Sequence, residues 1–322
     1  MSIFKRRSRL GRAVALTLAF GIAGAGAARA DQFINILTGG TSGVYYPLGV
    51  ALSKVFAEKI KGVRPSVQST KASVENLNLI QQGKGELAFA LGDAVADAWK
   101  GEPEVGFKKP LDQLRGVAGI YANYIQIVAS KDSGIKSLAD LKGKRLSVGA
   151  PKSGTELNAR AILKAAGIEY KDLGKVEYLP FGESVELIKN RQLDATLQSA
   201  GLGVASIRDL ANSVPITVVE IPASVVDKVG SPYVKVMIPK GTYEGQAADV
   251  PTAAVKNYLV TNAKMPDDVV YGMTKALFDS LPDLQAAHAA AKAIKLESAL
   301  DGMPVPVHPG AQKFYKEKGL LK

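Results

Sequence analysis

The stretch ILTGGTSGVYYPLG, residues 36–49, predicts the first structural unit of this chain. An apolar run typical of a β-strand ends at Gly39 and Gly40, a loop of small polar residues follows, and Pro47 begins an amphipathic segment that we expect to be a helix. Proteins use this order to hold phosphates, dinucleotides or carboxylates, because the first turn of a helix leaves backbone N–H groups free. The loop alone does not choose among these ligands.

A second stretch with the same order begins near residue 145, where RLSVGAP reads as a strand, KSGT as a loop and ELNARAILKAAG as a helix. Short apolar runs alternate with helical patterns along most of the chain, which predicts an α/β fold with mainly parallel strands. We therefore expect two lobes, each presenting one strand–loop–helix unit.

The first thirty residues have the pattern of a secretory signal peptide. A basic start precedes a fifteen-residue apolar run, and Ala28-Arg29-Ala30 forms a cleavage site before Asp31. The Arg6-Arg7 pair leaves twin-arginine export open, although its flanks fit that signal poorly. We expect a periplasmic protein that is cleaved after Ala30.

The charge balance gives no support to a nucleic-acid partner. The chain carries a formal charge of +11, and the six basic residues of positions 1–30 leave +5 for the remainder, scattered among acidic residues. The chain has no cysteine, which excludes disulfides and thiolate chemistry, and only two histidines, His288 and His308. Hydrolase and metal-site interpretations are correspondingly weak, and we expect neither an enzyme nor a cofactor.

Two apolar segments, 116–129 and 233–241, read as strands that cross between the lobes. The chain would then pass to the second lobe and return, so the expected division is 31–120 plus 235–322 for lobe one and 121–234 for lobe two. Helices near 251–262, 266–280 and 283–294 would complete lobe one. Lobes joined by two crossings can hinge and close on a ligand.

Neutral donors gather at the predicted helix starts. The first loop offers hydroxyl groups and close backbone approach, Ser73 is the expected N-cap of a helix that also carries Asn76, and the second loop precedes a helix in the other lobe. Such donors suit a carboxylate. Each hydroxyl could also be only a helix cap, but two equivalent loops favour a site. The donors in question are Thr38, Thr41, Ser42, Ser73, Asn76, Ser153, Gly154 and Thr155.

Other ligands and chemistries have weaker patterns. No P-loop motif occurs, and the chain lacks the G-x-S-x-G elbow of serine hydrolases. The run GLGVAS, Gly201 to Ser206, lies 19 residues before Glu220 as in a dinucleotide site, but Ser206 stands where Gly or Ala is needed. An exported surface protein without a transport role is a further alternative.

The motifs at both ends of the chain resemble the TAXI family of TRAP-transporter solute receptors. The stretches that carry this resemblance are ILTGGTSGVYYPLG, SVENLNLI, DLKGKRLSVGAPKSGTELNAR and VHPGAQKFYKEKG, in order over nearly all of residues 31–322. The resemblance implies a type II-like periplasmic-binding-protein fold with two hinge strands. It also implies capture of a small carboxylate, such as a glutamate-like amino acid, a dicarboxylate or a keto acid, and delivery to TRAP integral-membrane subunits.

The resemblance also implies a set of ligand-binding positions and shows two departures at the cleft. Relatives often have Gln-Ser-Asp where this chain has Leu91-Gly92-Asp93, and a proline where it has Gly203. Lys71, Lys152 or Arg160 could assist, and either Tyr45 or Tyr46 faces the cleft. The expected ligand-binding residues are Thr38, Gly40, Thr41, Tyr45, Ser73, Asn76, Ser153, Gly154, Thr155 and Gln198.

Overall fold

The structure is a computed structural model that describes residues 31–322. These residues form one compact unit. The signal peptide predicted for residues 1–30 lies outside the described residues. Within the described part of the chain, no helix has the length and apolar character needed to cross a membrane.

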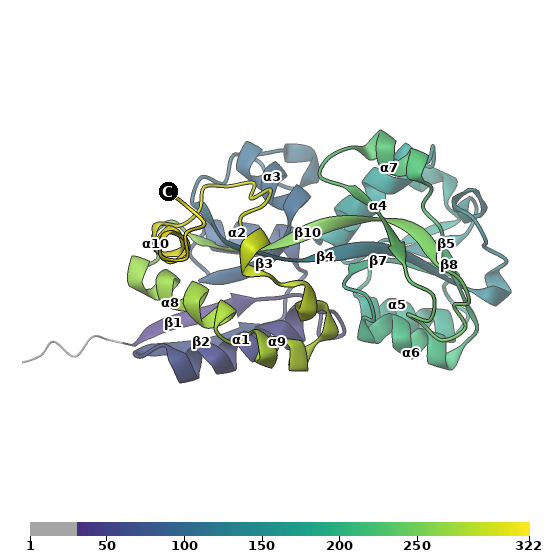
Figure 1. Cartoon of the computed structure of the whole chain (residues 1–322). Coiled ribbons are helices and arrows are strands. Elements are labelled where there is room, and N and C mark those ends of the chain that lie inside the picture. The colour runs from purple at the N-terminus through teal and green to yellow at the C-terminus, as the bar shows by residue number, and fades with distance from the viewer. Residues whose placement is uncertain (1–30) are drawn as a thin grey trace, which may run out of the picture. The chain divides into compact units, whose positions relative to one another are not determined.

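Strands and short helices alternate through the first two thirds of the described chain, and helices dominate its end (Figure 1). The predicted α/β class is therefore confirmed. The expectation of mainly parallel strands is wrong, because among residues 31–322 four strand pairings are parallel and five are antiparallel. The elements are β1 Gln32–Leu37, α1 Tyr45–Lys59, β2 Val63–Gln68, α2 Ser73–Gln81, β3 Leu87–Leu91, α3 Gly92–Lys100, β4 Leu114–Ser130, β5 Arg145–Ser147, α4 Gly154–Ala165, β6 Lys175–Glu177, α5 Phe181–Lys189, β7 Ala195–Ala200, α6 Ala205–Ser213, β8 Ile216–Val219, α7 Ala223–Val229, β9 Val234–Ile238, β10 Val250–Asn262, α8 Asp267–Phe278, α9 Leu281–Ala287 and α10 Pro309–Glu317.

The ten strands of residues 31–322 form one sheet with the main order β2-β1-β3-β10-β4-β7-β5-β6. Each end of the sheet is a parallel trio, β2-β1-β3 in lobe one and β7-β5-β6 in lobe two. The carboxyl ends of parallel strands are where α/β proteins place their binding loops. A binding site is therefore expected at the loops after β1, β3, β5 and β7.

Two long antiparallel strands, β4 and β10, join the lobes (Figure 1). The predicted crossing at 116–129 is β4, but the second crossing is β10. The helix predicted near 251–262 is therefore wrong, and the run at 233–241 contains only the short strand β9, which pairs with β10 alone. β10 lies between β3 and β4 and is buried on both faces, so its sequence lacks the alternation that would distinguish a strand from a buried helix. The exact lobe limits stay a prediction.

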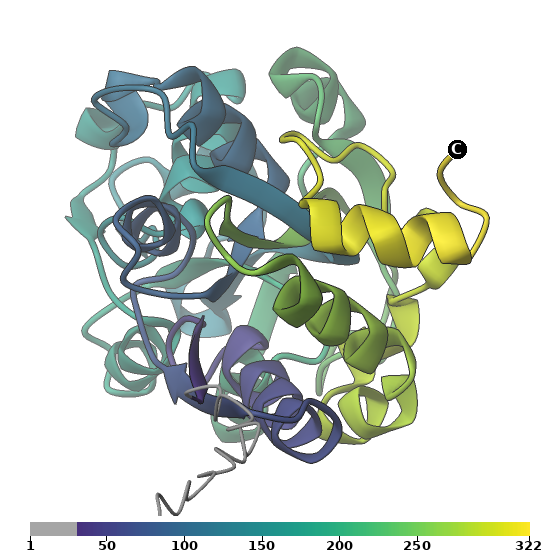
Figure 2. The ribbon, with the colours of Figure 1, turned by 90° about the vertical axis from the view of Figure 1, so that its left-hand side faces the viewer.

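The C-terminal helices return to lobe one. Figure 2 shows α10 beside α8, in agreement with their packing through Phe278 and Phe314, whose rings stack 5.8 Å apart. The Tyr315 hydroxyl donates to the carbonyl oxygen of Val117 on β4, 2.8 Å away. The helix predicted at 266–280 is confirmed as α8, whereas 283–294 holds α9 and a short 3₁₀ turn, Ala289–Ala293. These contacts fasten the chain end to the hinge strand.

Candidate functional site

A cavity of about 410 Å³ lies between the lobes, where the helix starts predicted from the sequence meet. Lobe one contributes the loop before α1 and the start of α2. Lobe two contributes the starts of α4 and α5, and β4 and β7 form part of the wall. Four helix N-termini, two from each lobe, therefore face one cavity.

The loop after β1 owes its shape to its own polar side chains. Thr38 is fully buried and its hydroxyl donates to the carbonyl oxygen of Gln68 at 2.8 Å. Asn76 is also fully buried, and its amide donates to the carbonyl oxygens of Thr38 and Phe89 at 2.7 and 2.9 Å. These two residues hold the loop rather than line the cavity. Helix α1 begins at Tyr45, two residues before the predicted start at Pro47.

The start of α2 differs from the prediction. Ser73 is the first residue of the helix rather than its N-cap, because Ala72 takes the capping position with a φ of 72°. The Ser73 hydroxyl oxygen accepts from the backbone N–H of Leu91 at 3.1 Å, which ties α2 to the end of β3. A positive φ in a residue other than glycine is uncommon and costly, and strained residues of this kind cluster at functional sites.

The loop residues at the start of α4 lie at a helix N-terminus as predicted, although the helix begins at Gly154, two residues before the predicted start at Glu156. Ser153 is the N-cap, and its hydroxyl oxygen accepts from the backbone N–H of Glu156 at 3.1 Å. The N–H groups of Gly154 and Thr155 have no acceptor among residues 31–322. Gly154 lies against the other lobe, since a Cβ placed there would be 2.7 Å from the Ser73 hydroxyl oxygen and 2.6 Å from a methyl carbon of Leu91. Both free N–H groups are therefore at the interface between the lobes.

Seven of the ten expected site residues line the cavity: Gly40, Thr41, Tyr45, Ser73, Ser153, Gly154 and Thr155. The other three do not. Thr38 and Asn76 support the loop, and the Gln198 side-chain oxygen accepts from the Ser206 hydroxyl at 2.6 Å. Of the two tyrosines left open, Tyr45 lines the cavity and Tyr46 does not.

Strand residues that the sequence patterns missed complete the wall: Tyr121 and Asn123 of β4 and Ser199 of β7. They are missed because both strands read as buried apolar segments. The hydroxyl of Tyr121 has no hydrogen-bond partner among the described residues, although the side chain is only 2% exposed. The alternation of β4 places Tyr121 and Asn123 on one face, so the pattern could have paired them once one was known to face the site.

A buried chain of amides positions Tyr45. Its hydroxyl donates to Asn257 of β10, whose amide donates to the side-chain oxygen of Asn123 at 2.8 Å. Burial raises the pKa of Tyr45 well above its usual value, so the phenol stays protonated. The ring stacks on Phe89 with centroids 5.0 Å apart. The cavity wall is thus neutral and rigidly held.

Charged side chains are at the rim of the cavity or away from it. Lys71 and Glu183 line its edge and are exposed, and Arg160 pairs with Glu156 at 2.6 Å. Lys152 does not line it. Lys144 and Arg145 lie at the amino end of β5, whereas Ala150, which lines the cavity, follows the carboxyl end of that strand. Any negative charge in the cavity would therefore face helix N-termini rather than a buried cation.

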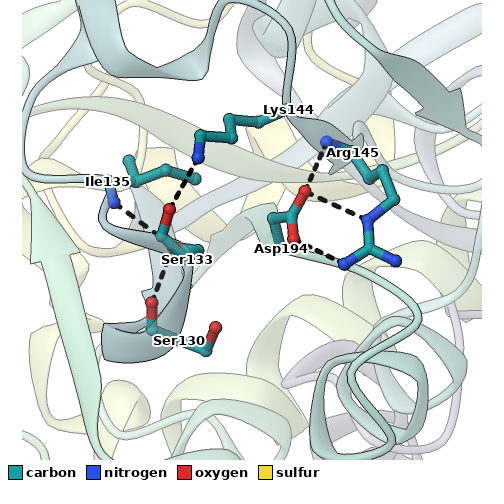
Figure 3. Close-up of polar contacts among 6 residues, drawn as sticks. All are labelled: Ser130, Ser133, Ile135, Lys144, Arg145 and Asp194. Carbon is teal, nitrogen blue, oxygen red and sulfur yellow. Dashed lines mark hydrogen bonds and ion pairs between the residues drawn. The ribbon is translucent and has the colours of Figure 1, made fainter.

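Figure 3 shows how these distant basic groups are used. The guanidinium and backbone N–H of Arg145 donate to both carboxylate oxygens of Asp194, at 2.6 to 3.1 Å, which joins the amino ends of β5 and β7. Lys144 donates to the carbonyl oxygen of Ser133 at 2.7 Å. These contacts brace lobe two.

The GLGVAS run and the two histidines, which could have indicated an enzyme, make packing contacts and hydrogen bonds within the fold. Gly201 packs closely against Ala290, since a Cβ placed on Gly201 would lie 2.8 Å from the Cβ of Ala290. The Ser206 hydroxyl donates a hydrogen bond to the side-chain oxygen of Gln198. His288 and His308 each accept a backbone N–H through Nδ1 and cap a following turn or helix. Within residues 31–322 no group of three His, Asp or Glu side chains could hold a metal ion.

Comparison with known proteins gives one family match and several solved structures of similar fold. The sequence pattern of the NMT1-like family matches residues 36–319. Among solved structures, MatC from Rhodopseudomonas palustris with bound malate is similar with a TM-score of 0.58 and 12% identity, covering 89% of this chain and 97% of that one.

Two further structures are similar at the level of the fold. The periplasmic binding protein BugD has a TM-score of 0.57 and 11% identity over 90% of this chain and 94% of its own. PhnD1 from Prochlorococcus marinus, in complex with methylphosphonate, has a TM-score of 0.56 and 12% identity over 90% and 99%. The fold is therefore that of periplasmic solute-binding proteins, as predicted.

Proposed function

We propose that this chain, which belongs to the NMT1-like family, binds a small carboxylate between its lobes and delivers it to TRAP-type membrane subunits. The family and the fold make it a solute-binding protein of a transporter rather than an enzyme. The TAXI resemblance drawn from the sequence agrees with the family. The proposal adds three points to the family and the fold: a carboxylate ligand, TRAP membrane subunits as the partner and a periplasmic location.

The convergence of four helix N-termini on one neutral cavity carries the proposal. The helices α1, α2, α4 and α5 are 15, 9, 12 and 9 residues long, so each has a full first turn with free N–H groups. Each N-terminus favours negative charge by about 0.3 to 1 kcal/mol, and more when partly buried. Together the four N-termini can hold an anion without an arginine in the cavity.

Delivery to a membrane partner would use the closed form. A ligand that touches α2 of lobe one and α4 of lobe two together favours the closed arrangement, because the open arrangement offers only one of these surfaces. Closure thus presents a distinct surface when the cavity is occupied. The motifs shared with TAXI receptors support TRAP subunits as the partner.

The first experiment is thermal unfolding of residues 31–322 with a panel of carboxylates, namely succinate, glutarate, 2-oxoglutarate, malate and L-glutamate, each beside its amide or ester. A ligand at a hundred times its Kd that binds only the folded form stabilises it by about 2.7 kcal/mol, which is several degrees in Tm. A shift with an acid and none with its amide is expected. No shift with any member, after refolding to remove carried-over ligand, would contradict the proposal.

The matched variant is the double substitution Ser153→Ala and Thr155→Ala. Both side chains line the cavity, and only Ser153 has a partner in the fold, so the loss of the cap costs about 1 kcal/mol of stability. The variant should stay folded, and its affinity for the ligand should fall because two cavity-lining hydroxyl groups are removed. Unchanged affinity would remove α4 from the site.

A further inference from the structure

The two lobes are joined across the cleft by a buried polar contact beside the cavity. Asp93, the second residue of α3 in lobe one, accepts from the side-chain amide of Asn158 on α4 of lobe two at 2.6 Å. The same carboxylate oxygen accepts from the Tyr233 hydroxyl at 2.7 Å. Asp93 is 7% exposed and Asn158 is fully buried.

This contact is connected to the cavity wall by one further hydrogen bond. The side-chain oxygen of Asn158 accepts from the hydroxyl of Ser199 at 2.6 Å, and Ser199 lines the cavity. The carbonyl oxygen of Ser199 accepts from the amide of Asn123, also in the wall, at 2.8 Å. The position of Asn158 is thus set from one side by the wall and from the other by lobe one.

We propose that Asp93 and Asn158 are positioning residues that form an inter-lobe clasp, which holds the lobes closed and orients Ser199 toward the cavity. The clasp exists only when α4 lies against α3, because its two members belong to different lobes. Opening would separate them and return both to water. The proposal concerns closure and does not depend on the identity of the ligand.

The surroundings of Asp93 make the clasp sensitive to protons. Burial raises the pKa of Asp93 to about 6, although the hydrogen bonds that its carboxylate accepts lower it in part. The titratable groups that interact with Asp93 are Asp97, one turn along α3, Tyr45 of α1 and Tyr233 before β9. Helix α4 presents the neutral Asn158.

The other three elements that pack against α3 bring no charge to Asp93, and β3 has no titratable residue. α2 presents the neutral Ser73, and β10 presents Tyr258 beside Gly92. Within residues 31–322 no lysine or arginine forms an ion pair with Asp93. Its negative charge is therefore costly when the lobes are closed.

The sign of the pH effect follows from this cost. In the open form the carboxyl is solvated and its pKa returns toward the ordinary 3.8, so closing takes up a proton between about pH 4 and pH 6. The ratio of closed to open protein should then be about tenfold higher at pH 5 than at pH 7. Above pH 7 both forms are ionised and the ratio should be constant.

The test measures closure without any ligand, so its failure is distinct from failure of the proposed function. The chain has no cysteine, so cysteines at the exposed positions Lys84 and Lys164 can carry spin labels on the two lobes. Double electron–electron resonance at pH 5 and pH 7 should show the larger closed fraction at pH 5. The same distance distribution at both pH values would overturn the proposal.

Three variants separate the clasp from general effects. Asp93→Asn, which mimics the protonated carboxyl, should remove the pH dependence, whereas Asp97→Asn on the same helix should keep it. Asn158→Asp should open the lobes at pH 7, and combining it with Asp93→Asn should restore closure because the donor and acceptor are exchanged. A pH dependence that survives in Asp93→Asn, or a double variant no more closed than Asn158→Asp, would overturn the proposal.

Discussion

The substitution Gly154→Ala should separate ligand affinity from stability. Gly154 is the first residue of α4, and no positive φ requires glycine there. A methyl group at this position would lie 2.6 Å from a methyl carbon of Leu91 and 2.7 Å from the hydroxyl oxygen of Ser73, both in lobe one. These distances are far below van der Waals contact, so the lobes could not close fully.

The magnitude follows from the location of the clash. Overpacking of a well-packed contact costs about 1 to 3 kcal/mol, and here the cost falls only on the closed form. Affinity should therefore fall about 5- to 150-fold. The unliganded protein can relieve the clash by opening, and alanine is the better helix former, so its Tm should be unchanged or slightly higher.

The assay is calorimetric titration with the tightest acid of the carboxylate panel, beside thermal unfolding without ligand. Gly182→Ala is the matched control, because Gly182 also lies in a first helical turn that faces lobe one, yet a methyl group there meets only the Ser42 side chain, at 3.4 Å from its hydroxyl oxygen. It should change affinity by less than about threefold. A Tm lowered by several degrees in Gly154→Ala with unchanged affinity would refute the reasoning.

Three further substitutions test the wall, the rim and the brace of lobe two. Tyr121→Phe removes a buried hydroxyl without a partner in residues 31–322, so Tm should hold while affinity for a ligand that bonds to it falls about three- to tenfold, by titration. Lys71→Gln at the exposed rim should weaken binding less than about threefold and flatten its dependence on salt, measured from 50 to 500 mM NaCl. Asp194→Asn should cost about 1 kcal/mol in urea unfolding at pH 7 and less at pH 3, because Arg145 lowers the pKa of Asp194 and the stability that the pair provides is lost as pH falls below 3.8 and through the lowered pKa.

Local patterns were sufficient for the units that build the site. The strand before Gly39, the loop and helix after Lys152 and the helix α8 depend on residues close together in sequence, and the structure confirms each. Seven of the ten expected residues reach the cavity because helix starts after parallel strands point to one edge of a sheet.

Long-range contacts decided the rest. The segment 250–262 becomes a hinge strand only because β3 and β4 accept it on both sides, and its apolar composition fits a buried helix equally well. Ser73 lies in the first turn of α2 instead of capping it, and its hydroxyl accepts from the backbone N–H of Leu91, eighteen residues later.

The same distinction separates the loops from the clasp. Glycine, hydroxyl residues and a following helical pattern are local signals, so the chain determined by itself where its binding loops begin. Asp93 and Asn158 are 65 positions apart, and Tyr233 is 140 from Asp93, so nothing near any of them in the sequence indicates that they meet. Only the closed packing of α4 on α3 brings them together, because a hydrogen bond between lobes depends on their relative position.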